Sequence, residues 1–250
     1  MLGHHVASIP ASHITLIVTL LTIFAGSLAA GLAGFANSAI AGAVLFHWLP
    51  PIDAVPLLLA CSITTQLFSI SKLWRTMQWR QCLPYLVGGF AGIPLGARLL
   101  EGFSPRMFAA GFGFFLICYS VFMLLRPQFV VRSGGRYAEI MAGFAGGITG
   151  GATAFPGAIP AIWCNARGMS KLEQRGIVQP FILLMQIATL VYFSKLGIFA
   201  SGTWTTFAWC VPAVVIGTWL GLKLFDRIDD NRFRQIVLMF LLISGATLIL

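Results

Sequence analysis

Charged side chains are scarce in this chain. Only 9% of its 250 residues are Asp, Glu, Lys or Arg, whereas 58% are hydrophobic. An average soluble domain is about one-quarter charged, so this composition excludes a soluble protein and predicts an integral membrane protein. A helix needs about 20 apolar residues to span a bilayer. The length therefore allows at most about ten membrane elements joined by short loops.

Acidic residues are the scarcest charged type, and none lies in the middle of an apolar segment. The seven acids all fall in or beside expected loops: Asp53, Glu101, Glu139, Glu173, Asp226, Asp229 and Asp230. The chain therefore has no carboxylate placed like the proton relays of many pumps. It also lacks a cluster with metal-ligand spacing and a glycine-rich phosphate loop. We expect no enzyme activity, no metal and no cofactor.

The cysteines and the basic residues exclude two further classes. Five cysteines stand singly in apolar stretches without a CxxC pair, which is typical of packing residues rather than disulfides or metal ligands. The formal net charge is +9, but Lys and Arg lie between apolar segments. Basic loops of this kind face the cytoplasm, so we expect a lipid bilayer and no nucleic acid as the partner. The N-terminus has no basic n-region, and we expect no cleaved signal peptide.

What the chain does contain is an internal repeat. Gly31, Gly34 and Asn37 recur 116 positions later as Gly147, Gly150 and Thr153, and Gln66 recurs 120 positions later as Gln186. A third stretch, Gly92, Gly96, Arg98, Leu99 and Phe108, recurs 125 positions later as Gly217, Gly221, Lys223, Leu224 and Phe233. In membrane chains such repeats are characteristic of secondary transporters, which bind substrate near the bilayer midplane between the two halves.

The apolar pattern predicts an all-α polytopic protein with five membrane elements in each half. Their expected ranges are Ile14–Ala30, Ser38–Phe46, Ala54–Ile70, Leu83–Leu100 and Met107–Leu125, then Ala138–Ile148, Ala154–Cys164, Gly176–Phe193, Trp204–Leu224 and Gln235–Leu250. Residues 1–13 form a tail, 14–125 a first repeat, 126–137 a cytoplasmic linker and 138–250 a second repeat. The second element of each half, and the first of the second half, are too short to span alone. Each first pair is therefore predicted to be a glycine-rich hairpin.

The parity of five elements predicts that the second half is inverted relative to the first. Assigning alternate loops to one side collects 13 of the 16 Lys and Arg there and leaves Arg98, Arg106 and Lys195 on the other. The positive-inside rule makes the rich side cytoplasmic, with both termini on the periplasmic side.

Two hairpin tips are the predicted binding site: the first tip, Gly31–Ser38, and the second tip, Gly147–Gly157. Under inversion their short helices would point their N-termini at a common point, where partial positive charge and free N–H groups bind an anion. The alternative is that these small residues only allow close helix packing. The expected substrate-binding residues are Gly34, Asn37, Ser38, Gln66, Thr149, Gly151, Thr153, Phe155 and Gln186.

Within this set Asn37, Ser38 and Thr153 are N-cap types, and Pro156 suits a first helical turn. Gln66 and Gln186 lie in otherwise apolar runs, where an unpaired amide is costly. Either could instead bond a neighbouring backbone. Thr64, Thr65 and Gln179 are weaker candidates, and Arg98 and Lys223 are expected to reach the headgroups.

At its repeat ends the chain resembles the sulfite exporter TauE/SafE family. The matching motifs are Gly92-Ile-Pro-Leu-Gly-Ala-Arg-Leu-Leu100, Trp219-Leu-Gly-Leu-Lys-Leu-Phe-Asp-Arg-Ile228 and Phe233-Arg-Gln-Ile-Val237. The resemblance implies a transporter in the bacterial inner membrane for sulfite, thiosulfate or small organosulfonates. One departure is Phe35-Ala-Asn37-Ser38, where the family usually has a run of glycines.

Three readings follow. The first is a secondary transporter of a small sulfur oxyanion or organosulfonate that works by alternating access, with H⁺ or Na⁺ as a possible coupling ion and a homodimer as a possible assembly. The second is a passive anion channel, and the third, which the missing catalytic groups disfavour, is an intramembrane enzyme.

Overall fold

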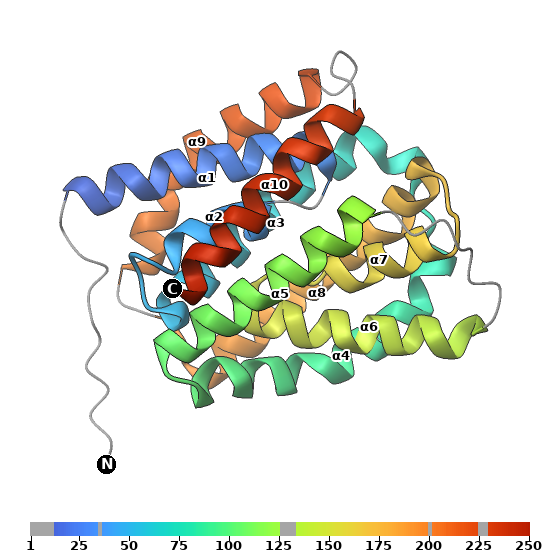
Figure 1. Cartoon of the computed structure of the whole chain (residues 1–250), viewed down its shortest axis with the longest axis horizontal. Helices are drawn as coiled ribbons and strands as arrows, with labels where there is room; N and C mark the ends of the chain where they lie inside the picture. Colours follow the sequence, from blue (N-terminus) through green and yellow to red (C-terminus); the bar gives the residue numbers. More distant parts are fainter. Residues whose placement is uncertain (1–12, 35–36, 126–133, 200–201, 225–229) are drawn as a thin grey trace.

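The structure is a computed structural model that describes residues 13–34, 37–125, 134–199, 202–224 and 230–250 (Figure 1). These residues form ten α-helices and one short 3-10 helix, η1 (Trp74–Thr76), and no strand occurs among them. The helices are α1 (His13–Ala33), α2 (Asn37–Leu45), α3 (Pro51–Leu73), α4 (Trp79–Gly102), α5 (Pro105–Leu125), α6 (Gly135–Thr153), α7 (Ala158–Ala166), α8 (Lys171–Leu196), α9 (Thr203–Leu224) and α10 (Asp230–Ile249). The predicted all-α fold is confirmed. The predicted tail and most of the linker lie outside the described residues.

Six helices are long and apolar enough to cross a membrane, namely α1, α3, α4, α5, α8 and α9. Each supplies at least 20 residues of low charge, which at about 1.5 Å per residue matches the hydrocarbon core of a bilayer. The chain is therefore a multi-pass membrane protein.

The helices pack in pairs that connect the two halves of the chain. The most extensive contacts are between α4 and α6, between α1 and α9, and between α5 and α10. Figure 1 shows α1 beside α9 along one edge and α4 beside α6 along the opposite edge. The third helices α3 and α8 also contact each other, and each contacts the fourth helix of the other half. This scheme of pairs is unchanged when the two halves are exchanged.

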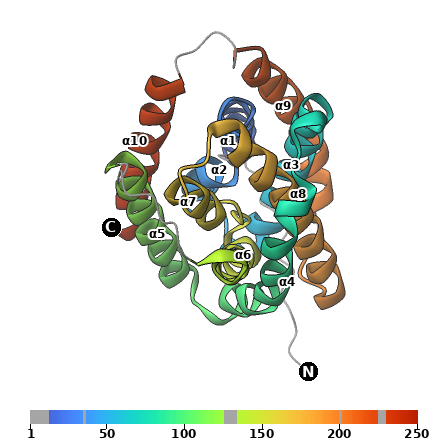
Figure 2. The same cartoon turned by 90° about the vertical axis from the view of Figure 1, so that its right-hand side faces the viewer.

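The short helices α2 and α7 lie in the interior. Each has nine residues, and in α2 all but Val44 are buried. The pattern predicted two short helices here, but it began the second one at Ala154, four residues before the observed start of α7. Figure 2 shows them enclosed by α1, α4 and α6, by α5, and by α3 and α8. Because nine residues extend only about 14 Å, neither helix can cross a membrane alone. Each instead follows a break in the chain, α2 after the end of α1 and α7 after the end of α6.

The prediction of a short first element in the second half is wrong. Helix α6 continues to Thr153 and has 19 residues, where the pattern ended it at Ile148. The reason is the role of its glycines. A Cβ added at Gly143 or Gly147 would meet the carbonyl oxygen of Tyr85 or Gly89 in α4, and one added at Gly92 would meet that of Phe144. These glycines allow close backbone contact within a helix and do not end it.

Candidate functional site

The first tip is a break between α1 and α2. Helix α1 ends at Ala33, and Gly34 follows in the left-handed region with φ +90°. The N–H of Gly34 donates to the carbonyl of Ala30 at 2.7 Å. Its own carbonyl accepts a hydrogen bond of 3.1 Å from Nε2 of the buried Gln66 in α3. Phe35 and Ala36, part of the departure from the family pattern, lie outside the described residues.

The second tip repeats this geometry 120 positions later. Helix α6 ends at Thr153, and Ala154 adopts the left-handed conformation with φ 59°. Its N–H donates to the carbonyl of Gly150 at 3.0 Å. Its carbonyl accepts a hydrogen bond of 3.2 Å from Nε2 of the buried Gln186 in α8. Each tip thus has a left-handed residue whose carbonyl binds the glutamine of the third helix.

The structural match corrects the predicted register of the tips by one helical turn. Gly34 corresponds to Ala154 rather than to Gly150, so the counterpart of Asn37 is Gly157. Thr153 is not an N-cap, because it ends α6 and its hydroxyl donates to the Thr149 carbonyl at 2.7 Å. Glycine-rich helices match each other in several registers that differ by one turn, and only the hydrogen bonds distinguish them.

Gln186 also contacts the third helix of the first half, where α3 packs against α8. Gln186 Nε2 donates to the hydroxyl of Ser62 at 2.8 Å as well as to the second tip, and Ser62 lies one turn before Gln66 on α3. Both glutamines are almost fully buried, and the Oε1 atom of each has no hydrogen-bond partner. This packing therefore places an unpaired amide oxygen beside each tip.

A cluster of buried hydroxyl groups surrounds the start of α2. Thr65 Oγ1 lies 3.4 Å from Ser27 Oγ of α1 and 3.4 Å from Thr218 Oγ1 of α9. It also accepts a hydrogen bond of 3.5 Å from Asn37 Nδ2. The Asn37 Oδ1 atom and the hydroxyl of Ser38 are buried without a partner. Four helices thus contribute polar atoms to the first tip.

Two side chains of α8 complete the first tip, and sequence reasoning gave little weight to either. Arg175, assigned to a loop, donates from Nη2 to the carbonyls of Gly31 and Leu32 at 3.4 and 3.2 Å. A Cβ added at Gly34 would lie 2.9 Å from Arg175 Nε and 3.0 Å from Gln179 Nε2.

The sequence did contain a signal for this placement. Ser170 and Glu173 form a capping box that starts α8 at Lys171. Arg175, Gln179 and Gln186 then follow at spacings that put them on one helix face.

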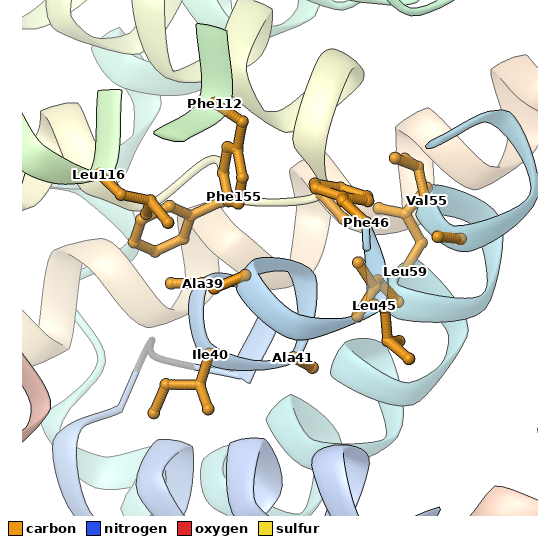
Figure 3. Packing of buried hydrophobic residues seen from close by; sticks show 14 of the residues in the cluster. Ala39, Ile40, Ala41, Leu45, Phe46, Val55, Leu59, Phe112, Leu116 and Phe155 are labelled. Atoms are coloured by element: carbon orange, nitrogen blue, oxygen red, sulfur yellow. The ribbon is translucent and has the colours of Figure 1, made fainter. Parts of the chain in front are cut away.

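The other predicted site residues have local roles. Thr149 is half-buried and donates to the Gly146 carbonyl of its own helix at 3.1 Å. Gly151 packs against Ile93 and Gly96 of α4. Phe155 lies in an apolar cluster with Phe112, Leu116 and Ala39 (Figure 3), and its ring is edge-on to Tyr119 at 5.7 Å.

The remaining basic candidates have exposed side chains. Arg98 is exposed, and Lys223 is exposed with its ammonium 4.9 Å from the centroid of the Trp219 ring. Four of the five cysteines are buried free thiols, and Cys118 is exposed. Within the part of the chain that the structure describes, no group of three or more His, Cys, Asp or Glu could hold a metal ion.

The sequence matches one known protein family over most of its length. The model of the family described as sulfite exporter TauE/SafE matches residues 18–248, nearly the whole chain. The chain belongs to this family. A comparison with curated proteins and one with solved structures give no match. Membership of TauE/SafE makes the protein an exporter-type anion transporter, which is consistent with the prediction that it is not an enzyme.

Proposed function

We propose that this TauE/SafE protein is a secondary transporter of a small sulfur-containing anion, such as an organosulfonate, sulfite or thiosulfate. It works by alternating access around the two tips, in a bacterial inner membrane with both termini on the periplasmic side. The family supports anion transport. The fine geometry of the tips supports a binding site between the two halves.

The main observation behind the proposal is that the carbonyls of Gly34 and Ala154, one at each tip, both accept a hydrogen bond from a buried glutamine. The C-terminal end of a helix carries partial negative charge and repels an anion. At each tip a buried glutamine donates to the last carbonyl, and at the first tip Arg175 covers two more. These donors offset the negative ends of α1 and α6. The N–H groups at the N-termini of α2 and α7 then dominate the electrostatic potential near the tips, and this potential favours an anion.

The exchanged helix pairs support the mechanism. Two inverted repeats that swap their packing give two equivalent end states, one open to each side of the membrane. When the two halves are exchanged, the pair α1–α9 becomes the pair α6–α4, as this mechanism requires. The coupling ion, H⁺ or Na⁺, and a homodimer stay predictions.

The test is uptake of radiolabelled ethanesulfonate into proteoliposomes that contain the purified protein. We expect saturable uptake that is accelerated by unlabelled ethanesulfonate on the opposite side, and weaker competition from propionate. Sulfonate and carboxylate differ in the number and arrangement of their oxygens, which N–H groups recognise. Flux that neither saturates nor shows counterflow would favour the channel, and absence of both uptake and binding for every sulfur anion would refute the proposal.

Two substitutions test the site. Gln66→Leu and Gln186→Leu should each weaken binding by about 1–3 kcal/mol, because each leaves a buried tip carbonyl without its donor. Arg98→Gln is the control, since the side chain of Arg98 is exposed. Unchanged affinity in both leucine variants, with loss in Arg98→Gln, would move the site to the membrane edge.

A further inference from the structure

The two tips share a backbone geometry but differ in side-chain chemistry. Arg175 and Gln179 lie against the first tip, and the residues 120 positions earlier, Val55 and Leu59, are fully buried and apolar. Thr65, the centre of the hydroxyl cluster, corresponds in the same way to the buried Met185. The first tip is therefore polar and positively charged, whereas its counterpart is not.

The immediate neighbours of the second tip confirm this difference. A Cβ added at Gly157, just before α7, would meet side-chain carbons of Ile182 and Val178. Phe155 of the same tip packs into the aromatic and aliphatic cluster. Gln186, which also bonds to Ser62, reaches this end by a hydrogen bond, whereas the side chains beside Gly157 are apolar.

Gln179 is the unusual side chain at the first tip. It is 1% exposed, and neither its Nε2 nor its Oε1 has a hydrogen-bond partner. A buried amide without hydrogen-bond partners has a free-energy cost, because it has lost its bonds to water and gained none in the protein. A polar side chain kept at such a cost, aimed at Gly34 next to a guanidinium, is explained by a ligand that supplies the missing bonds.

Resting on the proposed function, we propose that the side chains that bind the anionic group of the substrate all lie at the first tip, and that the second tip offers it only backbone N–H groups. Gln179 Nε2 donates to one of its oxygens, and Arg175 supplies a fixed positive charge beside it. The second tip, where Ile182, Val178 and Phe155 pack, contributes no charged side chain. The site is therefore one-sided within a fold whose two halves are equivalent in backbone.

The experiment measures ethanesulfonate affinity by calorimetry with the full-length protein in nanodiscs, together with thermal stability. Gln179→Leu should lower the affinity about tenfold and leave thermal stability unchanged or raised, because the unpaired buried amide is removed. If Gln179 had a purely structural role, its substitution would instead lower the thermal stability and leave the affinity for ethanesulfonate unchanged. Gln179→Glu, nearly the same shape, should lose more affinity than Gln179→Leu because its carboxylate repels the ligand or neutralises Arg175.

The role of Arg175 is tested by comparing variants that remove or keep its positive charge. Arg175→Gln should lower the affinity about tenfold or more, and Arg175→Lys should lose less, because the positive charge is kept. The controls are Gln174→Leu, the same residue type on the same helix bonded to the Ala161 carbonyl, and Arg80→Gln, an exposed charge. Both should stay within about twofold of the wild type.

Wild-type affinity in Gln179→Leu and Gln179→Glu, or equal losses in the two Arg175 variants and in Arg80→Gln, would overturn the one-sided site. If the wild-type protein bound neither ethanesulfonate nor sulfite, the proposed function itself would fail. The two failures are therefore distinguishable.

Discussion

At the residue scale, one backbone conformation is built from two different amino acids. Gly34 and Ala154 both end a long helix in the left-handed region and both present a carbonyl to a glutamine. Glycine enters this region at little cost, whereas alanine pays about 1 kcal/mol or more because its Cβ crowds the following carbonyl. The surroundings of Ala154 must therefore hold it in place.

This difference predicts opposite responses to exchange of the two residues. Gly34→Ala should lower the apparent melting temperature, because the new Cβ has an unfavourable φ and lies 2.9 Å from Arg175 Nε. Ala154→Gly should stay within about 1 kcal/mol of the wild type, since relief of strain is offset by the greater freedom of glycine in the unfolded chain. Intrinsic tryptophan fluorescence during heating measures both. A larger loss in Ala154→Gly than in Gly34→Ala would contradict the proposed equivalence of the two tips.

Single residues also show which features of the candidate site could be predicted from the sequence. Gln66 and Gln186 could be predicted as a pair, because polar residues in apolar runs are conspicuous, and the structure does place each at a tip. The charge at the first tip could not. Arg175 was assigned to a loop because its charge outweighs its helical spacing from Gln179 in any reading by hydropathy. Its contact with α1 is made between residues 144 positions apart, which no local pattern reports.

At the element scale, glycines have two structural roles that composition alone does not distinguish. They can end a helix, or they can let a second helix pack closely against it. All ten helices were predicted, most of them with ends a few residues from those observed, because long apolar runs are strong signals. Helix α6 was the exception, since its glycines were taken as a turn. In the structure Gly143, Gly147 and Gly151 face α4, and the actual break follows at Ala154.

The α4–α6 contact predicts a sharp contrast between two glycines. Gly92→Ala should lower stability by about 1–3 kcal/mol, because its Cβ would meet the Phe144 carbonyl oxygen and the helices would have to separate. Gly111→Ala in α5 is the matched control. Nothing lies within 4 Å of its added Cβ, and alanine favours a helix by about 1 kcal/mol over glycine. Thermal unfolding in detergent compares them, and equal melting temperatures would disprove close packing at Gly92.

At the scale of the whole molecule, the exchange of helix pairs supports a duplication. Helices α1, α2 and α3 begin and end close to 120 positions before α6, α7 and α8, whereas α5 begins 125 positions before α10. The offset is nearly constant through the first three elements and increases afterwards, so the added residues lie after the third helix of the second half. The one-turn error at the tips explains only the first step of the offset read from the sequence, from 116 to 120, whereas the later increase to 125 is real.

If the two halves are inverted, as the loop charges predict, equivalent helix ends should lie on opposite sides of the membrane. Ser71 and Ser194 are both exposed in the last turns of α3 and α8, and each hydroxyl donates at 2.8 Å to the carbonyl three residues earlier. In a background with all five cysteines replaced by alanine, Ser71→Cys should react with an impermeant maleimide only from the cytoplasmic side. Ser194→Cys should react only from the periplasmic side. The reason is the charge of the following loops, since Ser71 precedes the basic Arg75 and Arg80 and Ser194 precedes only Lys195.

A third position makes this experiment decisive. Ser104, exposed between α4 and α5, belongs to the loop with few basic residues, so Ser104→Cys should label from the periplasmic side together with Ser194→Cys. Labelling is compared in right-side-out and inside-out vesicles, with total accessible thiol measured after detergent is added. If Ser71→Cys and Ser194→Cys were modified from the same side, the two halves would be parallel. The N-termini of α2 and α7 could not then approach one site from opposite faces, and the anion site would have to lie in one half only.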